Sequence, residues 1–144
     1  HDVTRIASLL TDPRHLPMAL ALVMLLPGTP SVYSGDEFGL TGVKGSGIGA
    51  DDALRPPFPR HWSELGASET FELYRSAIAL RRAHPWVADA RVTVPYATDT
   101  GLLVQVEDAD HRLLLGINIG DEEASLPWDV PVLKVPAQSW VLQE

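Results

Sequence analysis

An almost unbroken apolar run covers residues 16–26 and predicts a buried helix. The Pro-Gly pair at 27–28 ends that helix, because proline cannot continue it and glycine accepts the positive φ of a helix end. The short segment 31–33 then predicts a strand, and the loop after it carries Asp36 and Glu37. Helix, turn, strand and loop make one αβ step of a parallel α/β protein, in which polar groups just past the carboxyl end of a strand usually face a ligand.

Three further patterns complete the first half of the chain. Thr11-Asp12-Pro13 suits the start of a helix, with proline in the first turn and Thr or Asp as the cap. The glycines and prolines of residues 41–60 argue against regular structure, and a loop of this length is usually functional or mobile. Ser68 is the predicted N-cap of a helix with helical spacing from Phe71 onward, which His84-Pro85 ends.

Beyond Trp86 the pattern changes to short, mostly apolar segments separated by polar turns. Such segments are typical of strands, and the polar residues 108–110 join two of them as a hairpin. We place a domain boundary just after Trp86, with an α/β part over residues 1–86 and a small antiparallel β domain over residues 87–144. The predicted strands include residues 92–94, 102–106, 113–119, 132–135 and 140–142.

The composition is that of an ordinary globular chain, with 45% apolar and 21% charged residues. A net charge of −8 argues against nucleic acid and anionic membrane surfaces as partners, since both attract basic faces. The apolar run at 16–26 is also too short to cross a bilayer, which takes about 20 residues. Without cysteine the chain has no disulfide, thiolate zinc site or thiol nucleophile, and its compartment is not fixed. His61, His84 and His111 are isolated, which gives no indication of metal binding.

His1-Asp2 is the first candidate for chemistry, because a carboxylate beside an imidazole at the mouth of a strand can serve glycosyl or acyl transfer. Taken alone, such a pair is more often a surface histidine and a capping aspartate. Asp36 and Glu37 favour a loop-fixing role over catalysis. Asp51-Asp52 with Arg55 either line a cleft or pair with each other and hold their loop shut.

Aromatic residues offer two further interpretations. Phe58 and Trp62, with Pro57, either form a platform on which the apolar face of a sugar stacks or pack against the rest of the protein, which is the commoner fate of such residues. Trp128 and Trp140 are predicted to belong to the core of the β domain.

Together, these motifs resemble the α-amylase family of retaining glycoside hydrolases. His1-Asp2-x-x-Arg5 is similar to the end of that family's Asn-His-Asp motif, after the seventh barrel strand. The helix at 16–26 resembles the seventh barrel helix, and residues 27–39 (Pro-Gly-Thr-Pro-Ser-Val-Tyr-Ser-Gly-Asp-Glu-Phe-Gly) resemble the eighth strand and its loop. Residues 71–85 resemble the eighth helix, and the later strands resemble the family's carboxyl-terminal β-sandwich. The resemblance covers essentially the whole chain in the right order.

The resemblance implies an α/β plus all-β fold: the last part of a (β/α)₈ TIM barrel over residues 1–86, followed by a small antiparallel β-sandwich over residues 87–144. It also implies cleavage of α-glucosidic bonds in α-glucans or maltooligosaccharides, with retention by double displacement, no organic cofactor and no metal in this segment. Asp2 would be the third acidic residue of the site, gripping sugar hydroxyls more strongly as the transition state forms. His1 would bind the same sugar, and Arg5 would orient the non-reducing sugar or form a structural ion pair.

The same resemblance places the nucleophile and the general acid, which retaining hydrolysis holds about 5–5.5 Å apart, upstream of His1. We therefore expect the chain to be a piece of a longer polypeptide that is inactive alone. Its partners would be an α-linked glucan and the upstream fragment of the same enzyme, although pairing with copies of itself is the alternative. Two other functions stay open: a carbohydrate-binding or barrel-capping module without chemistry, and a transferase acting on α-glucan, sucrose or trehalose.

Overall fold

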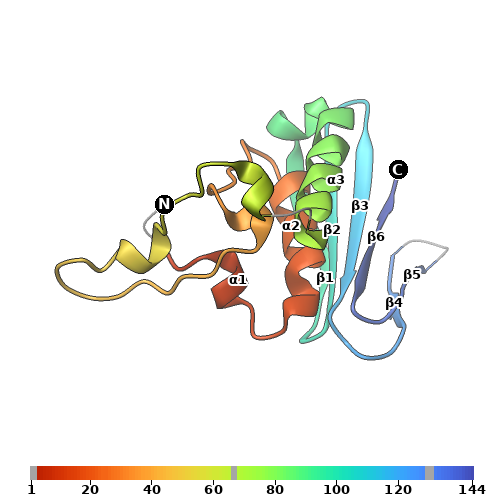
Figure 1. The fold of residues 1–144 in the computed structure, drawn as a ribbon. Coiled ribbons are helices and arrows are strands. Elements are labelled where there is room, and N and C mark those ends of the chain that lie inside the picture. The colour runs from red at the N-terminus through yellow and green to blue at the C-terminus, as the bar shows by residue number, and fades with distance from the viewer. Residues whose placement is uncertain (1–2, 66–67, 129–131) are drawn as a thin grey trace.

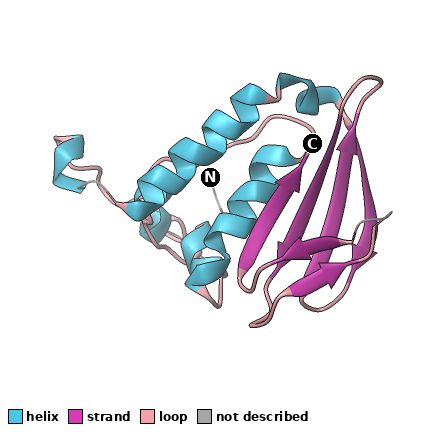
Figure 2. Ribbon diagram, turned by 90° about the vertical axis from the view of Figure 1, so that its right-hand side faces the viewer, coloured by secondary structure: helices cyan, strands magenta, loops and turns pink. Residues whose placement is uncertain are grey.

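The structure, a computed structural model, describes residues 3–65, 68–128 and 132–144 of the chain. Helices α2 and α3 lie on one side of an antiparallel sheet, and a short hairpin lies on the other (Figures 1 and 2). The α-helices are α1 (Ile6–Leu9), α2 (Leu16–Leu25) and α3 (Glu69–Ala83), and the short 3₁₀ helices are η1 (Pro13–His15), η2 (Asp36–Phe38), η3 (Asp52–Leu54), η4 (Trp62–Leu65) and η5 (Pro85–Asp89). The strands are β1 (Arg91–Ala97), β2 (Gly101–Glu107), β3 (Arg112–Asn118), β4 (Ala124–Leu126), β5 (Leu133–Val135) and β6 (Ser139–Gln143).

The apolar run at 16–26 forms helix α2, as predicted. The short helix η1 directly precedes α2, and its N-cap Asp12 accepts a hydrogen bond from the backbone N–H of Arg14 at 2.9 Å. The helix is apolar around most of its circumference because it lies between the sheet and α3, so residues on opposite sides of it are buried. Gly28, at φ +96°, turns the chain away after the helix.

Helix α3 also begins and ends where the sequence predicts. The Ser68 hydroxyl accepts a hydrogen bond from the Phe71 N–H at 3.1 Å, which satisfies one of the unpaired donors of the first turn. The helix ends at Ala83, because His84 precedes a proline and adopts a non-helical conformation. Figure 1 shows α3 lying beside α2.

The main sheet has the strand order β1-β2-β3-β6, and every neighbouring pair is antiparallel. Each of the five predicted strands falls on an observed one, and residues 108–110 form the predicted hairpin, with Glu107 opposite Arg112. The short strand β4, which pairs with β5 in a second sheet, was not predicted. Its segment offers only three residues, too few for a clear alternating pattern.

Two hydrophobic cores hold these layers together. The first lies between α2 and the main sheet and includes Met18, Leu25 and Leu115. The second lies between the two sheets and includes Leu103 and Leu126. Trp140 packs against the first core and Trp128 against the second, as predicted.

The first core crosses the predicted domain boundary at residue 86. Val87 is fully buried in it, together with residues of α2 and of the sheet. The division into residues 1–86 and 87–144 stays a prediction, and the two parts are joined by a continuous apolar interior rather than by a linker.

The prediction of a barrel strand at 31–33 is wrong for this chain. These residues form neither a strand nor a helix, and Ser31 and Val32 are exposed. A buried parallel strand exists only when strands beside it take its backbone hydrogen bonds, and every strand pair in the described residues is antiparallel and lies after residue 90. The antiparallel part of the predicted fold is therefore present, whereas the barrel sheet is not part of the described structure.

Candidate functional site

The predicted site begins at residues 1 and 2, which lie outside the described residues. The first site residue that the structure places is Arg5, just before α1. Arg5 is buried, with 3% of its surface exposed, and it lies where the amino-terminal segment meets the loop that follows residues 31–33. The geometry of the candidate site is therefore the geometry around the Arg5 guanidinium.

All five N–H groups of the Arg5 side chain are used within the chain. Both Nη atoms donate to the Ser34 carbonyl oxygen at 3.1 Å, and Nε and Nη2 donate to the Leu54 carbonyl oxygen at 3.0 and 2.7 Å. Nη1 also donates to Asp36 Oδ1 at 2.6 Å, and the ring of Tyr33 lies 4.2 Å from Cζ. The structural ion pair that the sequence left open is present, and contact between Arg5 and a sugar stays a prediction.

The carboxylates after residues 31–33 fix their own loop. Asp36 pairs with Arg5, and Glu37 Oε2 accepts a hydrogen bond from the Gly35 N–H at 2.7 Å. Gly35 itself sits at φ +98°, a conformation that glycine adopts without strain. The loop-fixing role expected for Asp36 and Glu37 is therefore the one that their contacts support.

Burial governs the electrostatics of this loop. It raises the pKa of the Asp36 carboxyl, while the hydrogen bond from Arg5 acts in the opposite direction. Burial, together with the negative charges of Asp36 and Glu37, raises the pKa of Tyr74 to about 12. Tyr74 of α3 is only 4% exposed, so its buried, neutral phenol borders the site on the α3 side.

The long loop at 41–60 is attached to the amino-terminal segment. The Arg5 N–H donates to the Gly42 carbonyl at 2.9 Å, and the Lys44 N–H donates to the Thr4 hydroxyl at 3.0 Å. Beyond these contacts the loop (yellow) extends away from the sheet, on the side of the molecule where the amino terminus lies (Figure 1). The loop also contributes Leu54, whose carbonyl accepts two hydrogen bonds from Arg5, so it is connected to the candidate site both at its beginning and at Leu54.

The charged centre of the loop pairs within itself. Asp51 Oδ2 lies 3.4 Å from Arg55 Nη2, and Asp51 Oδ1 lies 3.7 Å from Lys44 Nζ. Of the two interpretations left open by the sequence, internal pairing is the one these contacts support. Phe58 lies against Phe38 with ring centroids 6.2 Å apart, which supports packing, and the Trp62 side chain lies outside the described part.

A second arginine, which the sequence pattern did not single out, holds the other end of the 27–36 segment. Arg81 Nη1 donates to the carbonyls of Met24 and Leu26 at 2.9 and 2.8 Å, and Nη2 donates to that of Gly28. The end of α2 is thereby tied to α3. The only signal in the sequence was a basic residue in the last turn of a helix, which has many simpler explanations.

Two open cavities flank the segment that holds the site. One, of about 290 Å³, is lined by Arg5, Tyr33 and Asp36 together with apolar residues of α1 and α2. The other, of about 640 Å³, lies between residues 32–37 and one side of α3. The polar cluster around Arg5 is therefore bordered by uncovered apolar surface.

The described residues show no group of three or more His, Asp or Glu side chains placed to hold a metal ion. None of the helices within the described ranges is long and apolar enough to span a bilayer. What the arrangement offers is a buried guanidinium that binds Asp36 and the carbonyls of Ser34 and Leu54.

No protein-family model matches the chain. Solved structures, in contrast, match 99% of it. The cyclic α-maltosyl-(1→6)-maltose hydrolase from Arthrobacter globiformis in complex with its cyclic sugar gives a TM-score of 0.79 at 22% identity, and the debranching enzyme from Nostoc punctiforme gives 0.75 at 25% identity. The maltogenic amylase from S. marinus gives 0.73 at 20% identity. The chain spans 33%, 31% and 21% of these three structures, respectively.

The chain has the fold of the carboxyl-terminal portion of α-amylase-family enzymes. The resemblance found in the sequence is thus confirmed at the level of the fold, over nearly the whole chain. In the described residues this carboxyl-terminal portion consists of the antiparallel sheet domain and a few helices, without the barrel sheet.

Proposed function

We propose that the chain belongs to a retaining glycoside hydrolase that cleaves α-glucosidic bonds in α-glucans or maltooligosaccharides. The observation that carries the proposal is the match over 99% of the chain to a cyclic maltosyl-maltose hydrolase, a debranching enzyme and a maltogenic amylase. These enzymes share an activity on α-glucans, and the chain corresponds to the same portion of each.

In this proposal Asp2 is the third acidic residue of the site. It accepts hydrogen bonds from sugar hydroxyls that strengthen as the ring flattens toward the oxocarbenium-like transition state, so it lowers the barrier rather than merely aiding binding. His1 binds the same sugar. Arg5 lies three residues further on and anchors this segment through Ser34, Asp36 and Leu54, in addition to any contact of its own with the sugar.

The nucleophile and the general acid come from the preceding part of the parent enzyme in this proposal, and that part also covers the apolar surface beside the site. Several large apolar residues around the two cavities are exposed, such as Val3 at 68%, Leu9 at 62% and Val32 at 37%. Exposed contiguous apolar surface usually marks an interface. Size-exclusion chromatography with mass spectrometry tests this step: the isolated chain should associate with the upstream fragment, and a stable monomer that ignores that fragment contradicts the step.

The experiment that tests the function uses the full-length parent enzyme and three substrates. Maltoheptaose, sucrose and trehalose are each incubated with the enzyme, and the products and their anomeric form are followed with time. Net hydrolysis of maltoheptaose with an initially α-configured product supports the proposal. An initially β-configured product contradicts retention, and action on sucrose or trehalose alone contradicts the substrate class.

A transferase is the second candidate, and one match favours it. The cyclomaltodextrin glucanotransferase CldA has the same fold over 99% of the chain, with a TM-score of 0.72 at 20% identity. In the maltoheptaose experiment, a transferase gives longer or cyclic products where a hydrolase gives shorter ones. Those products therefore separate the two activities directly.

A binding or capping module without chemistry is tested on the complete chain, because the first hydrophobic core joins the β domain to α2. The chain is mixed with insoluble starch and the bound fraction is measured. Retention on starch favours a carbohydrate-binding role, and its absence favours capping.

A further inference from the structure

The first strand of the β domain, β1, leaves one side of its backbone without a partner. In the strand order β1-β2-β3-β6 it lies at an edge, and within the described ranges it pairs only with β2. All of its residues except Tyr96 are exposed, including Val92 at 41% and Val94 at 56%. Unpaired N–H and C=O groups along an exposed edge strand are a template for another strand.

The hydrogen-bond alternation of the sheet shows which residues of β1 point their backbone groups outward. The Asp108 N–H donates to the His111 carbonyl at 3.0 Å, which begins the ladder between β2 and β3. Because the groups of successive residues point to opposite sides, those of Gln105, three residues earlier, point toward β1. Thr93 lies opposite Gln105 and therefore faces β2, whereas the N–H and C=O of Val92 point to the open edge.

A register shift limits how much of this edge can accept a strand. The shift lies between Thr93 and Tyr96, so Val94 and Pro95 are not matched one to one with residues of β2. Pro95 has no N–H to offer to a second strand, and proline is one of the devices that blunt a sheet edge. The part of β1 that can accept a strand is therefore short and centred on residues 92–94.

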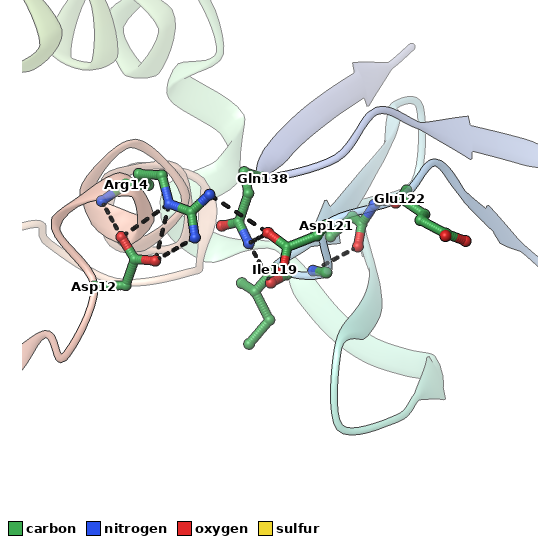
Figure 3. A network of polar contacts seen from close by, with 8 residues as sticks. Asp12, Arg14, Ile119, Asp121, Glu122 and Gln138 are labelled. Carbon is green, nitrogen blue, oxygen red and sulfur yellow. Dashed lines mark hydrogen bonds and ion pairs between the residues drawn. The ribbon is translucent and has the colours of Figure 1, made fainter.

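The opposite edge of the sheet is engaged within the chain. Residues 139–142 of β6 are half-buried, and β6 lies against α2. Just before β6, Gln138 donates to the Ile119 carbonyl at 2.7 Å and to Asp121 Oδ1 at 3.2 Å, and Arg14 reaches the same carboxylate at 3.4 Å (Figure 3). In the part of the chain that the structure covers, the outer side of β1 makes no such hydrogen bond. The open edge of the sheet is therefore β1.

We propose that β1 pairs with β1 of a second copy of the chain, antiparallel and around a two-fold axis at Thr93. This register places Val92 of each copy opposite Val94 of the other, so that the valines meet on one face of the joined sheet. Val92 also lies opposite Val106 of the first hydrophobic core, which the valines would extend. The two Thr93 side chains meet on the other face, where cross-strand threonine pairs are favourable.

The local sequence favours a second copy over a different partner. Val92-Thr93-Val94 reads the same in both directions, which is what antiparallel pairing around a two-fold axis requires. The nearest charge on the strand, Arg91, lies outside these three residues and is paired with Glu107 at 2.6 Å. An isologous contact of this kind closes at two chains, so it does not continue into a filament.

The size and charge of the contact make the dimer weak. One short strand pair falls below the area that stable protein interfaces bury. Each copy carries a net charge of −8, so the copies repel each other most strongly at low ionic strength. We expect a dimer that forms reversibly at high concentration and becomes tighter as salt is added. No residue of β1 lines the two cavities beside the Arg5 site, and the proposal does not depend on the proposed function.

Sedimentation velocity of the complete chain tests the association. The unaltered chain is measured between about 1 μM and 1 mM, at low and high salt. Val94→Lys should raise the dissociation constant of the dimer about two- to thirtyfold, because the two-fold axis removes two equal valine pairs at once. Val132→Lys is the matched control, since Val132 is 50% exposed and lies outside β1, and it should leave the dissociation constant unchanged.

Cysteine, which the chain lacks, tests the register. Thr93→Cys places a thiol opposite its own symmetry mate. The Cα atoms of such a non-hydrogen-bonded pair lie about 4.5 Å apart, which a disulfide can bridge. Arg91→Cys lies on the same strand and face, but about 14 Å from its symmetry mate, which is out of reach. On mild oxidation we expect a covalent dimer of Thr93→Cys and none of Arg91→Cys.

The measurements on the unaltered chain stand even where a variant folds poorly. A chain that stays monomeric at the highest concentration overturns the proposal, and so does equal weakening of the dimer by Val94→Lys and Val132→Lys. A dimer that cross-links equally through both cysteines, or through neither, overturns the two-fold pairing at Thr93. In that case the copies associate through another surface, such as the apolar surface beside the two cavities.

Discussion

Arg5 and Asp36 form a buried ion pair that joins the segment before α1 to the loop after residues 31–33. Nη1 lies 2.6 Å from Oδ1, and only 2% and 11% of the two side chains are exposed. The same guanidinium binds two backbone carbonyls, those of Ser34 and Leu54, so one side chain fixes three segments that are distant in sequence. The arrangement of these three segments therefore depends on the Arg5 side chain.

Removing one partner of the pair should destabilise the chain strongly. The Asp36→Leu variant leaves the buried Arg5 charge without its counter-ion, which typically costs about 3–5 kcal/mol. Urea unfolding followed by circular dichroism measures the loss. Arg14→Leu is the matched control, because Arg14 also pairs with an aspartate, Asp12, but its side chain is 58% exposed, and solvent-exposed pairs contribute little to stability. Equal losses of unfolding free energy in the two variants would show that burial does not determine how much the Arg5–Asp36 pair stabilises the chain.

Alanine substitutions at two glycines with nearly the same φ distinguish the cost of backbone strain from the cost of steric crowding. Gly28 has φ +96°, and a Cβ added there would meet no atom within 4 Å, whereas at Gly35, with φ +98°, a Cβ would lie 2.5 Å from Leu40 Cδ1 and 3.4 Å from Arg5 Nη1. Gly28→Ala should cost about 1–3 kcal/mol, the strain of a left-handed residue. Gly35→Ala should cost that strain plus about 1–3 kcal/mol of overpacking. Urea midpoints of the two variants provide the comparison, and a Gly28→Ala loss as large as that of Gly35→Ala contradicts it.

Because its pKa is lowered in the folded chain, the Asp12 carboxyl should make the free energy of unfolding decrease in acid. The Arg14 guanidinium, and after it the Arg14 backbone N–H, lower the pKa of Asp12 from 3.8 to about 2. Between these values the unfolded chain binds the proton more readily, so the stabilising effect is complete above about pH 4 and is lost as the pH falls toward 2. Asp12→Asn should therefore flatten the decline of the urea midpoint in this window.

Other carboxyls add to the same decline, so the Asp12 contribution is obtained from a difference between variants. The pKa of Glu107 is lowered mainly by Arg91, and that of Asp108 mainly by the Asp110 N–H. Asp99→Asn, in the turn between β1 and β2, controls for the loss of one negative charge. Parallel curves for the unaltered chain and Asp12→Asn would contradict the assignment.

Tyr74 gives a prediction for alkaline solution. The pKa of its phenol rises from 10.0 to about 12, first because of burial and then because of the charges on Asp36 and Glu37. The unfolded chain loses this proton at lower pH than the folded chain, so stability is lost as the pH rises from about 10 to about 12. In Tyr74→Phe this loss should be smaller, and the last step of the phenolate absorbance titration should disappear. Superimposable titrations of the variant and the unaltered chain would contradict the assignment.

The sequence predicted the elements that depend on local signals. The cap at Ser68, the proline after His84 and the apolar run at 16–26 each act within one or two helical turns, and each lies where expected. The strand expected at 31–33 depends on hydrogen bonds from other strands, so its local pattern cannot decide its structure. The residues around Arg5 show the same limit, because a motif indicates that an arginine matters without indicating that Leu54, 49 residues away, accepts its hydrogen bond.

The role proposed for Asp2 leads to a prediction in the full-length parent enzyme. Asp2→Asn keeps the size of the side chain and removes the charge that strengthens hydrogen bonds to the sugar in the transition state. Turnover should fall by about 10²–10³, the usual loss for one such group, while the thermal unfolding midpoint stays near that of the unaltered enzyme. Asp110→Asn, in the turn between β2 and β3, makes the same chemical change at a residue that does not line the cavity beside Arg5, and it should leave turnover unchanged. Turnover near the original level in Asp2→Asn removes Asp2 from the mechanism, whereas an equal fall in both variants indicates a general effect of lost charge.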